Sequence, residues 1–312
     1  MLTLDPARVA ALLPWGALND ALAAMFRQGC ESPLRHAHTW PEGAGENTLL
    51  LMPAWQAGRY SGVKIVHVAP AHAPAVHAAY LLSDAHTGAP LALLDGGALT
   101  DRRTAAASAL AARHLARPDS RRHLILGSGK VAHALAGAYR AAFPIERIAV
   151  WSRDPANAER LAARLRAEGH PAVAAASPDP SEADIVSAAT LSTTPLLRGA
   201  AVRPGTHVDL VGAFRRTMRE SDTDLIARAT LVVDTRAGAL AEAGDVTQPI
   251  AEGAITESHV VAELAELLRG AHPGRRTAEE ITVFKSVGWA GEDLAAAILA
   301  YEAARAETAP PD

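Results

Sequence analysis

The chain has 312 residues, 49% of them hydrophobic and 21% charged, which suits about two folded domains and excludes a largely disordered protein. Its formal net charge is −4 and no basic stretch stands out, which argues against a nucleic-acid partner. The single cysteine, Cys30, excludes an internal disulfide and indicates a reducing compartment such as the cytoplasm. Charged residues and prolines interrupt the apolar stretches, so we expect neither a signal peptide nor a membrane-spanning segment.

The first part of the chain is predicted to combine helices with an antiparallel sheet. Apolar residues at helical spacing between residues 2 and 28, with a break near Pro14, predict two short helices. Four short apolar runs follow, joined by turns too short for a crossover helix, which predicts an antiparallel meander. An amphipathic helix is expected from Thr100 to Arg117, ended by Pro118. The four apolar runs are residues 48–52, 62–68, 78–83 and 90–94.

From residue 122 short apolar runs alternate with helix-like stretches, which predicts a parallel sheet wrapped by helices. The predicted strands are residues 124–126, 148–151, 172–176, 185–188, 207–211 and 231–233. The fold class is therefore α/β. We expect a Rossmann-type doubly wound parallel sheet in a domain of residues 118–288. We expect an α+β domain with an antiparallel sheet in residues 1–117, completed by a C-terminal helix within residues 289–312 that packs back on it.

A glycine loop follows the first predicted strand of the second domain. The loop reads Gly127-Ser128-Gly129-Lys130-Val131-Ala132, a G-x-G-x-x-A pattern that leads into a predicted helix. The first glycine permits a tight turn, the second lets backbone approach a pyrophosphate, and the helix N-terminus offers amides to the phosphates. A chance match that serves as a structural turn is the alternative. The position between strand and helix favours dinucleotide binding.

The second predicted strand ends in Ser152-Arg153-Asp154, where a dinucleotide-binding protein reads the ribose of the adenosine. An acidic residue at that point would bind the ribose of NAD, whereas a hydroxyl and a guanidinium suit the 2′-phosphate of NADP. The sequence therefore favours NADP over NAD. In the alternative interpretation Arg153 is a solvated loop residue and Asp154 caps the next helix.

Three cations in the first domain stand in unusual places. Arg102 and Arg103 lie in the first turn of the helix expected from Thr100, where the helix dipole disfavours positive charge unless an anion binds. Lys64 shares a strand face with Gly62 and Val66, so it is expected to be partly buried, and a buried lysine needs an anion or a lowered pKa. The alternatives are a surface arginine paired with a nearby aspartate, and an edge lysine that discourages strand pairing.

A metal site is not expected. His67, His72 and His77 recur every five residues, but no carboxylate cluster joins them and a strand would place His67 and Lys64 on opposite faces. No nucleophile elbow is present either, and Cys30 has no obvious base partner.

Further sequence blocks follow one another along most of the chain. They are Leu49–Ala54, Gly62–Lys64, Leu91–Asp95, Leu99–Ala106, Ser108–Ala112, Gly127–Gly129, Asp184–Val186, Met218–Glu220, Val232–Asp234, Glu242–Asp245, Thr282–Gly288 and Glu292–Asp293. In residue types and in order, this set resembles the ornithine cyclodeaminase/mu-crystallin family.

The resemblance implies a homodimer formed through the first domain and a nicotinamide cofactor bound by the second. It implies that Arg35, Lys64 and Arg103 hold the substrate's carboxylate, that Ser286 lies near the nicotinamide, and that Thr190 borders the cofactor. The expected cofactor-binding residues are Thr104, Gly127, Ser128, Gly129, Lys130, Val131, Ser152, Arg153, Thr190, Val211, Gly212 and Ser286.

One departure from the family bears on the reaction. Phe214 stands where ornithine cyclodeaminases have an aspartate that handles proton and amine chemistry, and a phenyl ring cannot accept a proton. The segment 71–77 also lacks the glycine-rich pattern and the threonine of the deaminases. Both differences disfavour lyase activity.

We therefore expect an NAD(P)H-dependent reductase of small cyclic imino acids, such as pyrroline-2-carboxylate or piperideine-2-carboxylate, or a related amino-acid dehydrogenase. A protonated imine accepts hydride more readily, and Lys64 or a water held by His77 is the expected acid. One alternative is ornithine cyclodeaminase, which converts L-ornithine to L-proline and ammonia on bound NAD. The other is a non-catalytic small-molecule binder of the mu-crystallin kind.

Overall fold

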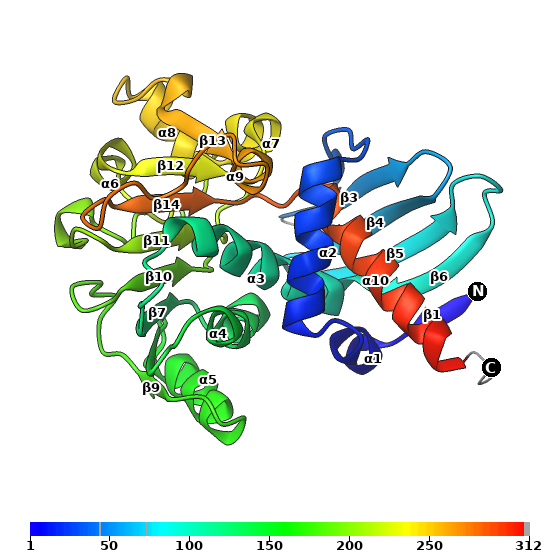
Figure 1. Ribbon diagram of the computed structural model, residues 1–312, viewed down its shortest axis with the longest axis horizontal. Helices are drawn as coiled ribbons and strands as arrows, with labels where there is room; N and C mark the ends of the chain where they lie inside the picture. The colour runs from blue at the N-terminus through cyan, green and yellow to red at the C-terminus, as the bar shows by residue number, and fades with distance from the viewer. Residues whose placement is uncertain (44, 73, 309–312) are drawn as a thin grey trace. The chain divides into compact units, whose positions relative to one another are not determined.

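The computed structural model describes residues 1–43, 45–72 and 74–308, which form two compact units (Figure 1). Unit 1 contains residues 1–103 and the chain from residue 289 onward, and unit 2 contains residues 104–288. The division falls inside one continuous helix, α3 (Gly96–Leu115), and not near residue 118, where the composition changes. The change in composition near residue 118 coincides with the end of α3. The boundary between the compact units lies earlier, after residue 103, because the first part of α3 packs in unit 1 and the rest in unit 2.

Unit 1 is built on a six-stranded sheet with the order β1-β6-β5-β4-β3-β2. The four strands predicted from the sequence are present and pair antiparallel, as expected. Two edge strands were not predicted: β1 has only three residues and pairs parallel with β6, so the sheet is mixed, and β2 is exposed along its whole length and lacks apolar alternation. The strands are β1 (Leu2–Leu4), β2 (His36–Glu42), β3 (Gly45–Gln56), β4 (Tyr60–Val68), β5 (Val76–Asp84) and β6 (Pro90–Asp95).

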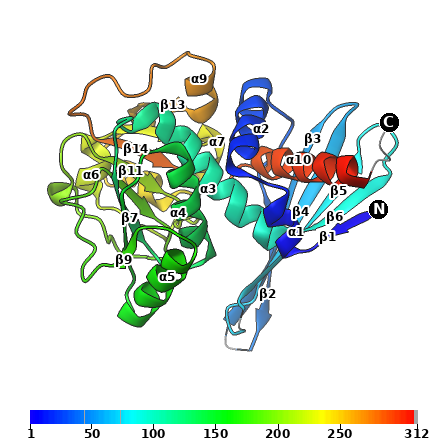
Figure 2. The same cartoon turned by 60° about the horizontal axis from the view of Figure 1, so that its bottom comes forward.

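Three helices of unit 1 belong with this sheet: α1 (Pro6–Ala11), α2 (Trp15–Gln28) and α10 (Ala290–Thr308). Asp5 caps α1 by accepting a hydrogen bond from the Arg8 amide at 2.8 Å, and Pro6 occupies the first turn, where its missing N–H costs nothing. Helix α10 packs against α2 and against strands β3 to β6, beside which it lies in both ribbon views (Figures 1 and 2). The last helix thus completes a core that the first residues of the chain begin.

The sheet of unit 1 has two distinct faces. Buried residues such as Met52, Lys64 and Tyr80 lie at facing positions on adjacent strands, and they share the face that α10 covers, because Lys64 bonds to a side chain of that helix. The residues between them, including Leu51 and Ile65, point to the opposite face, which we call the outer face.

Unit 2 contains an eight-stranded, all-parallel sheet with the order β13-β12-β14-β11-β10-β7-β8-β9. The predicted doubly wound α/β arrangement is confirmed, and all six predicted strands are present. Strands β13 and β14 were not among those predicted; each ends in a charged residue, which shortens its apolar run. The strands are β7 (Arg122–Leu126), β8 (Arg147–Trp151), β9 (Ala172–Ala174), β10 (Ile185–Ala188), β11 (His207–Leu210), β12 (Thr230–Val233), β13 (Val260–Glu263) and β14 (Thr282–Lys285).

The helices of unit 2 follow its strands. Helix α3 begins at Gly96, four residues earlier than predicted, so Arg102 and Arg103 lie in its second turn and not its first. Asp154 caps α5 through the Ala156 amide at 3.0 Å, as the alternative interpretation of that residue anticipated. The remaining elements are α4 (Lys130–Ala142), α5 (Pro155–Ala167), α6 (Thr223–Arg228), α7 (Arg236–Glu242), α8 (Gly244–Ala251), α9 (Leu264–Leu268) and the short 3-10 helices Gly199–Ala201 and Glu257–His259.

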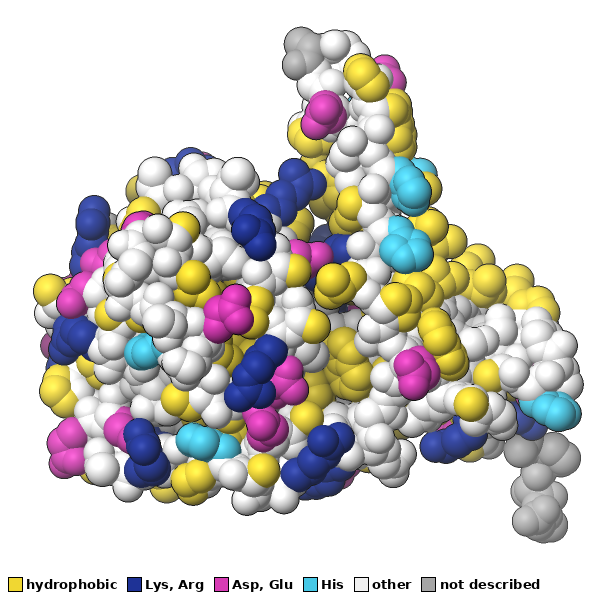
Figure 3. All heavy atoms as spheres, turned by 90° about the horizontal axis from the view of Figure 1, so that it is seen from above, with side chains coloured by type: hydrophobic (Ala, Val, Ile, Leu, Met, Phe, Trp, Pro, Cys, Tyr) yellow, Lys and Arg dark blue, Asp and Glu magenta, His cyan; other side chains and the backbone are white. Residues whose placement is uncertain are grey.

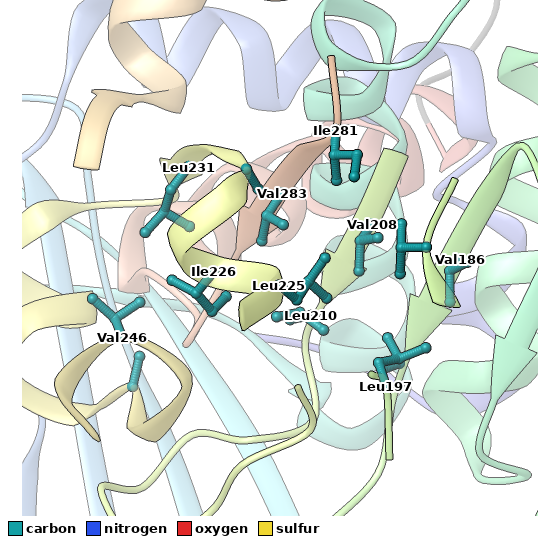
Figure 4. Close-up of a cluster of buried hydrophobic side chains, with 14 of the residues drawn as sticks. Val186, Leu197, Val208, Leu210, Leu225, Ile226, Leu231, Val246, Ile281 and Val283 are labelled. Atoms are coloured by element: carbon teal, nitrogen blue, oxygen red, sulfur yellow. The ribbon is translucent and has the colours of Figure 1, made fainter. Parts of the chain in front are cut away.

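One face of the parallel sheet carries the main hydrophobic cluster of unit 2 (Figure 4). Val208 and Leu210 on β11 and Val283 on β14 pack with Leu225 and Ile226 of α6, all fully buried. Full burial of each such side chain stabilises the fold by about 1.5–3 kcal/mol. This packing makes the sheet a rigid platform for the loops at its edges. Over the part of the chain that the structure describes, no helix has the length and apolar character needed to cross a membrane.

Candidate functional site

The carboxyl edge of the parallel sheet has the topology of a nucleotide site. Strands β7 and β10 are neighbours, while the chain continues from β7 to β8 on one side and from β10 to β11 on the other. The strand order therefore reverses between β7 and β10. In open α/β sheets, ligands bind at the carboxyl ends of the strands at this point.

The glycine loop lies directly after β7, at the reversal of strand order. Gly127 has φ +121°, and a Cβ on it would lie 2.5 Å from the Ala189 carbonyl oxygen, so only glycine is accommodated there. Gly129 is the N-cap of α4, makes no side-chain cap, and would find no atom within 4 Å of an added Cβ. Open space before uncapped helix amides suits a phosphate. The residues present therefore fit the pyrophosphate of a dinucleotide.

Ser152 and Arg153 follow β8, the neighbour of β7 on the other side from β10. The Ser128 hydroxyl donates to the Ser152 hydroxyl at 3.2 Å, so the structure brings the glycine loop and the end of β8 together. Arg153 is exposed beside them. The Asp154 carboxylate is turned to the helix amide that it caps.

A buried carboxylate joins the loops that follow β10 and β11. Glu220 Oε1 accepts from the Thr190 amide at 2.7 Å and the Thr190 hydroxyl at 2.8 Å, and Oε2 accepts from the Gly212 and Ala213 amides at 2.8 and 3.2 Å. A Cβ on Gly212 would lie 2.0 Å from the Thr190 carbonyl oxygen. The two loops thus touch through a position that only glycine permits, and Val211 precedes it, half-buried.

Two further buried charges lie next to Glu220. The Glu220 amide donates to Asp245 Oδ1 at 2.8 Å, and Lys285 Nζ lies 3.2 Å from Asp245 Oδ2. Burial raises the pKa of Glu220 above its ordinary value, Asp245 adds to this shift and Lys285 opposes it. The sequence blocks contained all three residues without assigning them a role.

Ser286 is held at the end of β14 by a carboxylate from the neighbouring strand. Its hydroxyl donates to Asp234 Oδ2 at 3.1 Å, and the same oxygen accepts from the amides of Val287 and Gly288 at 2.9 and 2.8 Å. Asp234 therefore fixes the turn that carries Ser286.

In unit 1 the structure brings together two of the three cations expected to bind a carboxylate. Lys64 Nζ lies 2.8 Å from Asp293 Oδ2, Arg103 Nε donates to Asp293 Oδ1 at 2.9 Å, and Arg103 Nη1 contacts Glu292 at 2.7 Å. The exposed fractions are 3% for Lys64, 4% for Arg103 and 0% for both carboxylates. Thr100 accepts a longer bond from Lys64 at 3.4 Å. We call Lys64, Arg103, Glu292 and Asp293 the buried charge cluster.

The two acids of the cluster were missed in the sequence analysis as functional residues. Their signal is an adjacent acidic pair in the first turn of α10, a helix whose neighbouring positions are mostly alanine and leucine. The acids replace the partner expected for the arginines, since Arg103 pairs with α10 and not with Asp101. Arg102 instead lies over the Trp15 ring, 3.6 Å from its centroid, and donates to the Leu13 carbonyl.

Burial has opposite consequences for the two cations of the cluster. Desolvation lowers the pKa of Lys64 to about 8, Asp293 opposes that shift, and Arg103 and Arg35 add to it. For Arg103, Asp293 and Glu292 outweigh the desolvation and raise its pKa above the ordinary value, so it stays charged. Desolvation also works against ionisation of Asp293, but Arg103 and Lys64 lower its pKa overall. The half-buried Arg35 lies within electrostatic range of Lys64.

His77 does not join this cluster. It is exposed and faces His67 across β4 and β5, whereas Lys64 faces Tyr80, so His77 points to the outer face and Lys64 to the buried one. Within unit 1, strand alternation therefore puts the two alternative proton donors, Lys64 and a water held by His77, on opposite faces of the sheet. Thr104 follows Arg103 in α3 and is buried, and Phe214 is half-buried after β11.

Comparison with known proteins tests the family resemblance. The profile of the "Ornithine cyclodeaminase/mu-crystallin family" matches residues 11–308. The chain belongs to this family. It is 42% identical over 293 residues to the Delta(1)-pyrroline-2-carboxylate reductase of Paracoccus denitrificans, which covers 88% of this chain and 92% of that protein. The expected resemblance is thereby confirmed.

Two solved structures share the fold of the whole chain. One is the Delta(1)-pyrroline-2-carboxylate reductase of Thermococcus litoralis in complex with NADH and L-proline, with a TM-score of 0.92, 34% identity and full coverage of both chains. The other is an archaeal alanine dehydrogenase dimer with bound NAD, with a TM-score of 0.90, 28% identity and coverage of 100% and 98%. These relatives are two reductases and a dehydrogenase, and the two solved structures hold NADH or NAD.

Proposed function

We propose that the chain is an NAD(P)H-dependent reductase of small cyclic imino acids of the pyrroline-2-carboxylate type. The observation that carries the proposal is the buried charge cluster, in which Lys64 and Arg103 share Asp293, in a chain related to enzymes that reduce this class of substrate. A bound nicotinamide cofactor supplies the hydride that the imine carbon accepts. The amino-acid dehydrogenase reaction is the same chemistry in reverse.

The charges of unit 1 suit a substrate with one carboxylate. Lys64 and Arg103 are paired with the carboxylates of Asp293 and Glu292, and Arg35 adds a positive charge within electrostatic range of Lys64. Charge-assisted hydrogen bonds from a lysine and arginines orient a small carboxylate well. We assign Arg35, Lys64 and Arg103 to carboxylate binding.

Lys64 is also our candidate for the proton donor. Its pKa of about 8 leaves the ammonium group mostly protonated at neutral pH and far readier to give up a proton than an ordinary lysine. Asp293 holds the ammonium group from one side. A protonated imine nitrogen withdraws electrons from the carbon that receives hydride, so proton donation by Lys64 accelerates reduction.

The residues after β7, β8, β10, β11 and β14 are assigned to the cofactor. Among them, Ser152 and Arg153 favour NADPH, because the carboxylate of Asp154 is occupied as a helix cap and Arg153 is free to meet a 2′-phosphate. The solved relatives hold NADH or NAD, so the proposal of NADPH rests on the residues of this chain alone.

We propose further that two copies of the chain associate through the outer face of the six-stranded sheet. Leu51 faces Ile65 and Val63 faces Leu81 there, and Leu49 lies on the same face. The space-filling view shows hydrophobic side chains gathered over this unit, with histidines beside them (Figure 3). A contiguous apolar face of this kind marks an association surface, and a relative of the same fold is a dimer. A cytoplasmic location, expected from the single cysteine, stays a prediction.

Oxidation of NADPH and NADH by the purified protein, followed at 340 nm, tests the function. We expect turnover with pyrroline-2-carboxylate or piperideine-2-carboxylate and little with pyruvate and an amine. Release of ammonia from L-ornithine without added cofactor would instead identify a cyclodeaminase. NADPH binding without turnover of any imine or amino acid would identify a non-catalytic binder.

A further inference from the structure

Three buried charged residues from separate segments of unit 2 meet behind the loops assigned to the cofactor. Glu220 precedes α6, Asp245 lies in the first turn of α8, and Lys285 ends β14, and each has an exposed fraction of 0%. Buried charges of this kind are costly unless they are paired and fully hydrogen-bonded. Their contacts therefore indicate what they hold in place.

The contacts form a chain that links the end of β14 to the loops after β10 and β11. Lys285 pairs with Asp245, and Asp245 accepts from the amides of Glu220 and Ser221 at 2.8 and 3.0 Å. The Glu220 side chain then reaches the loops after β10 and β11 through four hydrogen bonds, two on each oxygen. The rigid end of β14 thus supports Glu220, and Glu220 ties two loops together.

We propose that Glu220 is a positioning residue that sets the nicotinamide half of the cofactor site by locking the loop of Thr190 to the loop of Gly212. The proposal rests on the proposed function, because it takes the carboxyl edge of unit 2 as a nicotinamide dinucleotide site.

The topology assigns these two loops to the nicotinamide half. The pyrophosphate belongs to the glycine loop after β7, and the adenosine ribose belongs to the end of β8, where Ser152 meets Ser128. β10 and β11 lie on the other side of β7. The second half of a dinucleotide that crosses the edge of the sheet therefore meets the loops after β10 and β11.

A carboxylate is required at position 220 for a geometric reason. Oε1 faces two donors of Thr190 and Oε2 faces the amides of Gly212 and Ala213, so each oxygen only accepts. In Glu220→Gln an amide NH2 group that faced Gly212 and Ala213 would lose two hydrogen bonds, and one that faced Thr190 would lose the bond from the Thr190 amide, because only the hydroxyl can also accept. The substitution preserves size, so it tests the bonds and not the packing.

The test compares two ligands in wild type and Glu220→Gln by isothermal titration calorimetry. NADH carries the nicotinamide, and ADP-ribose carries everything except the nicotinamide. We expect Glu220→Gln to weaken NADH binding by about fivefold or more, since at least one hydrogen bond of about 1 kcal/mol is lost, and to change ADP-ribose binding by less than about twofold. Glu182→Gln, at an exposed residue whose nearest cation is 3.9 Å away, is the matched control and should leave both affinities unchanged.

Equal weakening of both ligands, or no weakening of NADH, would overturn the proposal. If Glu220→Gln does not fold, Thr190→Val removes one of the four bonds and should weaken NADH binding by a few fold without affecting ADP-ribose. An unchanged ratio of the two affinities in that variant would also overturn it. Failure of the proposed function has a different signature, because it appears in the wild type as absent imine reduction or absent NADH binding.

Discussion

Lys64 differs from an ordinary lysine in a strand because it is buried and because it lies beside charged side chains. It lies on the covered face of β4, two residues from Gly62, where an added Cβ would lie 2.3 Å from the Tyr80 hydroxyl oxygen. The close approach of Tyr80 to glycine leaves the lysine enclosed beside Asp293. The charged neighbours of Lys64 therefore affect its pKa. Two measurements can show whether the side chain takes part in catalysis.

Replacement of Lys64 by methionine should separate catalysis from cofactor binding. Lys64→Met removes the ammonium group while Arg103 still neutralises Asp293, so we expect kcat/KM for imine reduction to fall by at least about a hundredfold, the usual contribution of a positioned acid. NADPH affinity should change little, since the glycine loop belongs to unit 2. Steady-state kinetics and cofactor titration check this, with Arg59→Met, an exposed cation of the same unit, as control. Retained turnover in Lys64→Met would remove the lysine from the mechanism.

The pH dependence follows from the lowered pKa of the same lysine. The ammonium form donates the proton, so activity is present below the pKa of Lys64 and is lost as pH rises through about 8. We expect kcat/KM to decrease by about tenfold per pH unit above that value. An ordinary lysine, with a pKa of 10.5, would keep its proton well beyond it. A profile that stays flat to pH 10 would show that Lys64 is not the donor.

Single residues were predictable where the surrounding strand or motif was unambiguous. The partial burial of Lys64 followed from alternation, and the need for glycine at position 127 followed from the turn. The partners of Lys64 and Arg103 were not predictable. Glu292 and Asp293 lie about 190 residues or more further along the chain, and no sequence pattern indicates that they contact Lys64 or Arg103. That His77 and Lys64 lie on opposite faces of the sheet was not predicted, because only the strand register reveals which face a side chain occupies.

At the scale of elements, strand β8 has an exposed arginine at each of its two ends. Arg147 begins the strand and Arg153 follows its carboxyl end, and both are exposed. Only the carboxyl end of a parallel strand borders a nucleotide, so the two arginines should contribute differently to cofactor choice.

Arg153→Ala should lower affinity for NADPH by about tenfold or more, the worth of a charge-assisted bond to a phosphate, and leave NADH affinity within about twofold. Arg147→Ala serves as the matched control at the opposite end of β8 and should change neither. Fluorescence titration with both cofactors gives the ratio. If that ratio is the same in Arg153→Ala as in wild type, Arg153 does not read the 2′-phosphate.

Most elements were predictable from periodicity, and each exception has its own local cause. Apolar runs in the sequence predict strands β3 to β6 and the first six strands of unit 2. Strand β1 is not predicted because its three residues are too few to show a strand pattern. Strand β2 is not predicted because an exposed edge strand needs no apolar face. Likewise α3 starts at Gly96 because Asp95 accepts from the Ala98 amide at 2.7 Å, which stabilises a first turn that two glycines disfavour.

At the scale of the whole molecule, the outer face of the six-stranded sheet should determine the oligomeric state. Ile65 lies on that face in the middle of β4. Ile65→Glu would place a charge in an apolar interface, which costs enough to weaken association at least about tenfold. Wild type should sediment as a dimer of twice 32.5 kDa and the variant should dissociate toward 32.5 kDa.

Val173→Glu introduces the same charge at a residue of unit 2 that is 37% exposed, and it should leave the dimer intact. A wild-type protein that sediments as a monomer at micromolar concentration, or an Ile65→Glu variant as dimeric as wild type, would contradict the assignment of the interface.

The return of the chain to unit 1 at α10 affects how the protein is made. While the polypeptide emerges from the ribosome, Lys64 and Arg103 are available long before Glu292 and Asp293, so the first hundred residues cannot close around paired charges. The parallel sheet, synthesised in between, can be completed first. A nascent chain that stops before residue 289 would leave these cations without their acidic partners and the sheet without its covering helix, which would expose it to chaperones and proteases.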